Sequence, residues 1–345
     1  MNLDERFGDP EQRQSQFLAC SGAKIRSILD EQVPLLNDDQ QVITMTVGGN
    51  DVGLADILNA CVFQWWPFSS GCHQAIETSR ELIEGGFSAD LVQLLKAITP
   101  KLSRDPTNPG KLYVIGYADF FNSSTTQCDS TTWAFWYNIG NKQYLNQDVR
   151  KPLNELVDAV NKRISDAVKA AGDQAIFVDW HEYAAYDRGR YCEDGVIEPA
   201  PNRPGLMFYE WDTVDPDEDV ERLQQLAPNV DDGTFAGEVN KFVNWTVDRK
   251  QHHTLHESRQ DPTKLESRPS MRSAETIVEL DDNVERTYGS AHQPLIRVSW
   301  TRVFHPRPQT HALLANLVLD RMDLEHEKTM ARMRHDTQGR PMELK

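Results

Sequence analysis

Short apolar runs alternate along the chain with longer segments whose apolar residues recur every three or four positions. Three runs have the length and composition of buried strands: residues 42–47, 112–117 and 175–179. Four segments have helical periodicity: residues 21–36, 81–102, 149–171 and 309–322. This alternation predicts an α/β fold, in which helices cover both faces of a mainly parallel, doubly wound sheet.

The segment 149–171 has the most regular helical pattern, and Gly172 is expected to end it. Its apolar positions are Leu153, Leu156, Val157, Val160, Ile164, Ala167 and Val168. The predicted buried face of 81–102 contains Leu82, Leu91, Leu94, Leu95 and Ile98. Residues 17–19 predict one further short strand.

The pattern fades in two parts of the chain. Residues 212–293 are polar and have little periodicity, which indicates a partly disordered insertion. Residues 323–345 are charged and are expected to form a solvated tail. We therefore predict one domain, 1–322, whose insertion lies just before the last helix and is placed to act as a lid.

Composition narrows the possible partners. The chain has 345 residues and a net charge of -17, which argues against nucleic acid and anionic membranes. No run is long enough for a membrane-spanning helix, and the first ten residues lack the apolar region of a signal peptide. No GxGxxG motif follows a strand, so we expect no dinucleotide. We also expect no other cofactor and a monomeric protein.

The five cysteines predict two disulfide bonds and one unpaired thiol. Cys61 and Cys72 flank a loop rich in Trp, Pro, Ser and Gly, and Cys128 and Cys192 both lie in loop-like sequence. Cys20 is left without a partner. There is no CxxC pair and no histidine at zinc-ligand spacing beside the cysteines, so no metal site is predicted there.

Two other features have competing interpretations. His252 and His256 have the HxxxH spacing of metal ligands on a helix, but they lie in the polar insertion without a third ligand. A solvated stretch is therefore the preferred interpretation. The Trp-rich loop at 64–68 fits stacking inside a closed loop as well as it fits binding of lipid or sugar.

The end of the first predicted strand carries the main candidate chemistry. Gly48 and Gly49 permit a sharp turn, and Asn50 and Asp51 follow at the edge where parallel sheets bind ligands. The side-chain amide of Asn50 can donate hydrogen bonds into a crevice. The alternative is that Asn50 caps the next helix.

Three motifs, in this order, resemble the SGNH (GDSL-type) esterases and lipases, especially their secreted fungal and actinobacterial members. They are ACSGA at 19–23, GGND at 48–51 and FHPRPQTH at 304–311. They match the second, third and fifth blocks of that family, over roughly residues 15–212 and 294–322. GGND alone is a weak signal, whereas the ordered set is a strong one.

The resemblance implies a three-layer α/β/α hydrolase that cleaves carboxylic esters through a serine nucleophile and an acyl-enzyme. The substrate would be a small-molecule, lipid or polysaccharide ester. Gly22, through its main-chain N–H, and Asn50, through its amide, would form the oxyanion hole, and His305 would be the general base. Alternatively, Gly22 is only a glycine at the start of a helix, and His305 is an ordinary polar residue. His311 is expected to cap or pack the last helix.

The chain departs from the family pattern at two places. Arg302 stands where the family's DxxH carboxylate lies, so a main-chain carbonyl from 299–302 would have to orient His305. The GDS block, which carries the nucleophile, is not found before ACSGA. Ser15, Ser21 and Ser27 lack its context, so no nucleophile is assigned.

The missing block would supply a first strand in mid-sheet and an upstream cysteine to pair with Cys20. We therefore expect an N-terminally truncated form of an extracellular esterase, impaired in hydrolysis because the nucleophile block is absent. The sequons at Asn122 and Asn244 fit secretion. The alternative hypothesis is a catalytically inert ester- or glycan-binding remnant of the same fold.

Overall fold

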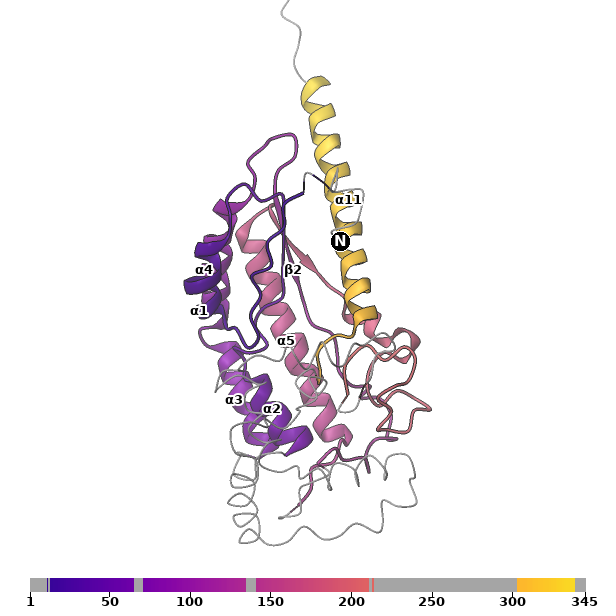
Figure 1. The fold of residues 1–345 in the computed structure, drawn as a ribbon. Helices are drawn as coiled ribbons and strands as arrows, with labels where there is room; N and C mark the ends of the chain where they lie inside the picture. The colour runs from indigo at the N-terminus through magenta and orange to yellow at the C-terminus, as the bar shows by residue number, and fades with distance from the viewer. Residues whose placement is uncertain are drawn as a thin grey trace, which may run out of the picture.

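The computed structural model describes residues 11, 13–64, 71–134, 141–210, 213 and 303–338. In these residues a small sheet lies between helices (Figure 1). Its strands are β1 (Val42–Met45), β2 (Lys111–Ile115) and β3 (Ala175–Val178). The α-helices are α1 (Ile25–Ser27), α2 (Leu54–Leu58), α3 (Cys72–Glu84), α4 (Phe87–Ile98), α5 (Gln147–Ala171) and α11 (Pro308–Gln338). Shorter helical turns are η3 (Ile28–Gln32), η4 (Val33–Leu35), η5 (Asn59–Phe63), η6 (Thr99–Lys101) and η7 (His181–Arg188).

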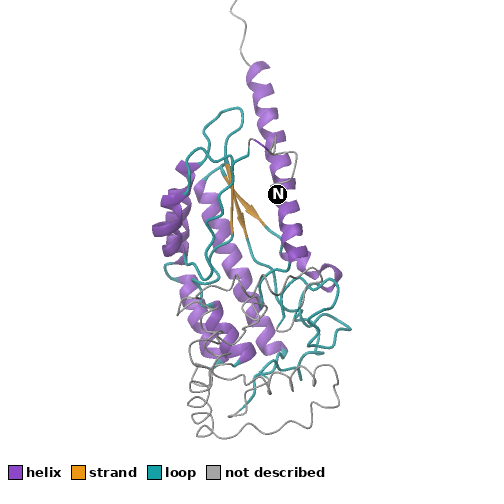
Figure 2. Ribbon diagram, viewed as in Figure 1, coloured by secondary structure: helices purple, strands orange, loops and turns teal. Residues whose placement is uncertain are grey.

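The sheet of the described residues is parallel, with the strand order β1-β2-β3 (Figure 2). Thr44 lies opposite Tyr113, which in turn lies opposite Ile176. Parallel pairing requires a crossover between consecutive strands, and helices supply it here. All three predicted strands and their parallel arrangement are confirmed.

Alternate residues of β2 pack on opposite faces of the sheet, as the period of a strand requires. Leu112 and Val114 belong to the large core cluster that includes residues of α4 and α5. Tyr113 packs with Val318 of α11 in a smaller cluster. The helices thus cover both faces, and the predicted three-layer α/β/α arrangement is confirmed (Figure 1).

Helix α5 forms where the sequence predicted it. Asn146 caps its first turn by accepting a hydrogen bond from the Val149 N–H, and Gly172 ends it with φ of 93°. Every apolar position predicted for its buried face is buried. Burial of each such side chain stabilises the fold by roughly 1.5–3 kcal/mol.

The segment predicted as a single helix over 81–102 is two helices. Gly85 ends α3 and Gly86 begins α4, because residues without a Cβ allow the chain to leave the helical conformation. Leu91, Leu94, Leu95 and Ile98 are buried as predicted. Leu82 is wrong as a core residue, since it lies on α3 and is 44% exposed.

Two further element predictions are wrong. Residues 17–19 form no strand, and the side chain of Phe17 is 90% exposed. The last helix does not end at 322, because α11 continues to Gln338, although most of its described residues after 322 are solvent-exposed. This stretch is rich in Glu, Lys, Met, Ala and Arg, which are strong helix formers, and Glu325 pairs with Lys111 and Lys328.

Both predicted disulfide bonds are confirmed. Cys61 is bonded to Cys72, and Cys128 to Cys192. Cys20 is a free, exposed thiol, as expected. No helix in the described residues is long and apolar enough to cross a membrane.

Several predictions fall on residues that the structure does not describe. These are the insertion at 212–293 apart from Thr213, the Trp-rich loop beyond Gln64, the HxxxH pair, and Arg302. The sequon at Asn122 is described: this residue is only 8% exposed, and its amide nitrogen donates to Glu193 at 2.9 Å.

Candidate functional site

The turn after β1 depends on its glycines. Gly48 has φ of 118°, and a Cβ there would lie 2.7 Å from Phe87, so a larger residue would displace that ring. The turn is closed by a hydrogen bond from the Asp51 N–H to the Gly48 carbonyl, at 3.0 Å. Asn50 is thereby held directly beyond the carboxyl end of the strand.

A partly buried tyrosine, Tyr117, supports this turn from just beyond the next strand. The Gly49 N–H donates to the Tyr117 hydroxyl oxygen at 2.9 Å. Asn161 of α5 fixes the tyrosine's main chain, accepting from its N–H at 2.8 Å and donating to its carbonyl at 2.7 Å. Burial raises the pKa of Tyr117 to about 12, so its hydroxyl is protonated at neutral pH.

Two hydrogen bonds join this turn to the segment that contains Gly22. The amide of Asn50 donates to the Ala23 carbonyl at 3.1 Å, and Asp51 accepts from the Ile25 N–H at 3.0 Å. Burial raises the pKa of Asp51, although the Ile25 N–H and Lys24 oppose that shift. Gly22, with φ of 72°, lies in a turn next to this contact.

His305 is held between two main-chain hydrogen bonds. The Phe304 N–H donates to the Tyr209 carbonyl at 2.8 Å, and the Tyr209 N–H donates to the His305 carbonyl at 2.9 Å. The His305 side chain is exposed, and its Nδ1 lies 3.2 Å from the Val303 carbonyl. The expected orienting carbonyl therefore belongs to Val303, one residue beyond the predicted range of 299–302.

Phe304 anchors the histidine segment in a cluster of aromatic rings. It has φ of 65°, an unusual conformation for a bulky residue, and its side chain is buried. Its ring centroid lies 4.9 Å from that of Phe120 and 5.0 Å from that of Tyr191. Packing against these rings holds the strained backbone in place.

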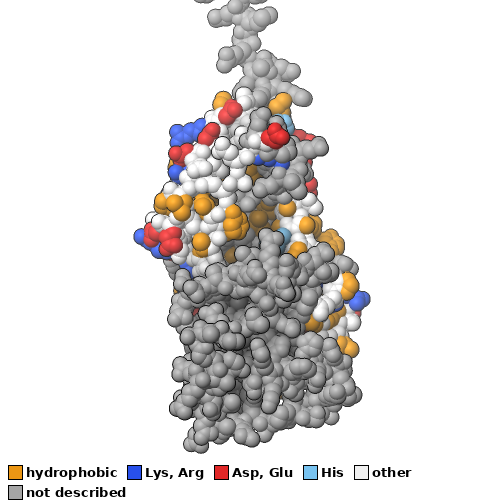
Figure 3. All heavy atoms as spheres, viewed as in Figure 1, with side chains coloured by type: hydrophobic (Ala, Val, Ile, Leu, Met, Phe, Trp, Pro, Cys, Tyr) orange, Lys and Arg blue, Asp and Glu red, His pale blue; other side chains and the backbone are white. Residues whose placement is uncertain are grey.

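The segments of Asn50 and His305 meet at one apolar cavity of about 50 Å³. Gly49 lines it from one segment and Phe304 from the other, and the remaining wall is largely aliphatic residues of α2 and α5. Hydrophobic side chains also lie across the middle of the face seen in Figure 3. The three predicted site residues are thus on segments that the fold brings together.

Sequence reasoning missed Tyr117 and Asn161. Tyr117 lies just beyond the carboxyl end of β2, the same position relative to its strand that made Asn50 a candidate. Its position at the end of a parallel strand could therefore have marked Tyr117 as a candidate site residue. Asn161 lies within a helical pattern and nothing in its local sequence distinguishes it, because its role depends on tertiary contact.

No protein-family model matches the chain. It is 29% identical over 170 residues to a lipase of Streptomyces rimosus, covering 48% of this chain and 55% of that one. It is 31% identical over 156 residues to lipase 1 of Streptomyces coelicolor, covering 45% and 50%. This similarity to two Streptomyces lipases supports, at modest identity, the SGNH-hydrolase relationship that the motifs predicted. It spans about half the length of these curated relatives.

Two solved structures also resemble the chain. One is phospholipase A1 from Streptomyces albidoflavus, with a TM-score of 0.39 and 23% identity, covering 51% of this chain and 64% of that one. The other is an extracellular lipase from Streptomyces rimosus, with a TM-score of 0.40 and 21% identity, covering 55% and 70%.

Proposed function

We propose that this chain carries the oxyanion-binding and general-base groups of a carboxylic-ester hydrolase. The main support is the cavity that Gly49 and Phe304 share, because it lies between the neighbours of Asn50 and His305. An ester hydrolase needs an apolar space for the acyl chain beside the polar groups that act on the carbonyl.

In this proposal His305 takes the proton of the nucleophilic hydroxyl and returns it to the leaving alcohol. Donation from Nδ1 to the Val303 carbonyl selects the tautomer whose lone pair is on Nε2. Gly22 and Asn50 donate to the oxyanion of the tetrahedral intermediate, and each such donor is worth roughly 10²–10³ in rate.

The size of the cavity favours a short acyl chain. Its volume of about 50 Å³ holds only a few methyl or methylene groups. We propose a small-molecule, lipid or polysaccharide ester as the substrate and an extracellular monomer as the working form. The two disulfide bonds support an oxidising compartment.

A second candidate function is binding without catalysis, and it has one observation in its favour. Ser79 is the serine found among the described residues that line the cavity. Its Oγ is buried and has no hydrogen-bond partner. A serine nucleophile needs an adjacent base to activate it, so Ser79 does not fit that role. An inert ester- or glycan-binding domain would need no such group.

Hydrolysis of 4-nitrophenyl acetate by the purified chain distinguishes the two functions. Turnover that is abolished in His305→Ala and kept in His73→Ala, a matched change at an exposed histidine of α3, would support the enzyme hypothesis. Such turnover would also require a nucleophilic hydroxyl other than the serines excluded above. The binding hypothesis predicts no turnover by the wild-type chain, together with saturable binding of the ester. Turnover that survives in His305→Ala would exclude the proposed general base.

A further inference from the structure

A second group of polar side chains gathers beside the carboxyl ends of β2 and β3, and its members are not among the residues that line the cavity. Asp119 follows β2, His181 opens η7 just after β3, and Asp158 lies on α5, which packs against β3. Each residue offers one potential ligand atom, and these three atoms all lie within 4.8 Å of one another. The three residues are distant in sequence, and only the fold brings them together.

The distances within this group are too long for hydrogen bonds. Asp119 Oδ2 lies 3.6 Å from His181 Nε2, and Asp158 Oδ1 lies 3.7 Å from His181 Nδ1. Two ligands of one cation, each at about 2.0–2.2 Å from it, lie roughly 3–4 Å apart. The two distances involve different ring nitrogens of His181, and an imidazole coordinates a given cation through only one of them. The gaps leave room for a cation that binds one His181 nitrogen and an oxygen of each aspartate, since three such atoms lie within 4.8 Å of one another.

Two atoms of the group are buried without a hydrogen-bond partner. Asp119 is only 9% exposed, and its Oδ1 is such an atom. His181 Nδ1, which faces Asp158, is the other. Burying a polar atom without a partner costs about 1–3 kcal/mol, so two in one cluster indicate that a bound ligand completes it.

We propose that Asp119, Asp158 and His181 bind a divalent transition-metal cation such as Zn²⁺. Two carboxylate oxygens and one imidazole nitrogen are a common ligand set for Zn²⁺ and Mn²⁺, and two negative charges favour a divalent ion. The cation would join α5 to the ends of two strands and would take water at its remaining positions. The site is separate from the proposed ester-hydrolysis residues and does not depend on them.

Calorimetric titration of the chelator-treated full chain with ZnCl₂ tests this proposal. Wild type is expected to bind one equivalent that Asp158→Asn, His181→Gln and Asp119→Asn lose or bind at least about tenfold more weakly. Asp158→Asn is the main variant, because the side chain is 67% exposed and the change leaves the fold intact. Zn²⁺ is also expected to raise the melting temperature of wild type but not of Asp158→Asn.

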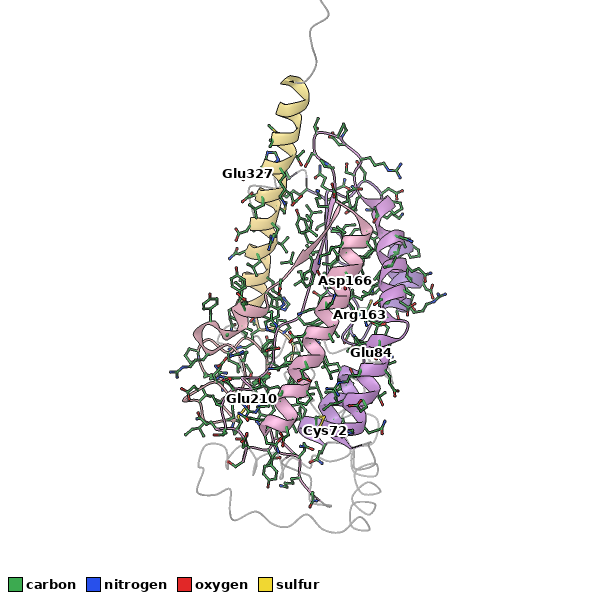
Figure 4. All side chains as sticks on the ribbon, turned by 180° about the vertical axis from the view of Figure 1, so that it is seen from behind. Cys72, Glu84, Arg163, Asp166, Glu210 and Glu327 are labelled. Atoms are coloured by element: carbon green, nitrogen blue, oxygen red, sulfur yellow. A yellow bond between two sulfur atoms is a disulfide. The ribbon has the colours of Figure 1, made fainter. Side chains whose placement is uncertain are left out.

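Two variants serve as controls for unrelated zinc binding. Asp166→Asn changes an exposed aspartate on the same helix, which Figure 4 labels, and His73→Gln changes an exposed histidine on α3. Both are expected to keep the full stoichiometry. The proposal is overturned if wild type binds no Zn²⁺, or if Asp158→Asn and His181→Gln bind it with the stoichiometry and affinity of wild type.

Discussion

The side-chain amide of Asn50 donates a hydrogen bond to the main-chain carbonyl of Ala23, with 3.1 Å between Nδ2 and the oxygen. This contact joins the turn after β1 to the turn that contains Gly22. Because the amide nitrogen carries two hydrogens, fixing one of them orients the other. A donor that is already held in place is what stabilisation of an oxyanion requires.

Replacing Asn50 with alanine should therefore reduce kcat for 4-nitrophenyl acetate by about 10²–10³ and change KM little, because the lost interaction forms mainly in the transition state. Asn108→Ala is the matched control, since Asn108 is exposed in the turn at 105–110. Steady-state kinetics of the three proteins provide the measurement. A wild-type kcat in Asn50→Ala would remove this residue from the oxyanion hole.

The sequence predicted those parts of the fold that follow from local periodicity. The strands, α5 and both disulfide bonds are in this class, since apolar spacing and cysteine position determine them. The break at Gly85 and Gly86 was missed because apolar spacing continued through it. The apolar periodicity of the last helix fades after 322, so it does not predict the continuation of α11 to Gln338, although the residues there favour helix.

Only those residues of the candidate site that lie in sequence motifs could be predicted from the sequence. Asn50 and His305 were found because each lies in a recognisable local pattern. The support of Gly49 by Tyr117 and the contact of His305 with the Val303 carbonyl depend on distances that spacing does not encode. The Asp119, Asp158 and His181 cluster has no motif at all, because it forms only when two strands and a helix are packed.

The buried carboxyl of Glu198 should make stability depend on pH. Glu198 and Glu210 both accept from the Ala200 N–H, at 3.0 and 2.9 Å, and Figure 4 labels Glu210. Burial raises the pKa of Glu198 above its ordinary value, although the Cys192 N–H and Arg203 oppose the shift. A raised pKa means that the folded state favours the protonated acid. This contribution is present below the ordinary pKa and is lost as pH rises through the folded-state pKa.

The change Glu198→Gln should remove that dependence, because an amide can replace the protonated acid as a hydrogen-bond donor beside Glu210. We expect wild type to lose more stability than the variant as pH rises from about 4 towards 7. Melting temperatures across this range, by circular dichroism, test the prediction. Glu182→Gln, at an exposed position, should follow wild type. Parallel curves for wild type and Glu198→Gln would contradict it.

The two disulfide bonds should differ in their contribution to stability. Cys128 and Cys192 are 64 residues apart and Cys61 and Cys72 are 11 apart, so the first closes the longer loop. The chain-entropy model gives roughly 4 kcal/mol for the first and roughly 3 kcal/mol for the second. Urea unfolding of the two double Cys→Ser variants provides the comparison, with Cys20→Ser expected to match wild type. Equal losses in the two double variants would show that loop length does not decide the difference.

Enlarging the cavity should change which acyl chains are accepted. Leu156 of α5 lines the cavity, and Leu156→Ala adds space next to the segments of Asn50 and His305. Leu95→Ala is the matched control, because Leu95 is 1% exposed in α4 and is not among the residues lining the cavity. Both variants should lose about 2–5 kcal/mol of stability, since each leaves a buried void.

Only Leu156→Ala should shift the preference from acetyl towards longer acyl esters, because only there does the added space adjoin the ester carbonyl. The ratio of kcat/KM for 4-nitrophenyl hexanoate and acetate, measured below the melting temperature of both variants, gives the result. One added methylene in an apolar pocket changes this ratio by about 10- to 200-fold at most. If Leu156→Ala and Leu95→Ala give the same ratio as wild type, the acyl chain does not occupy this cavity.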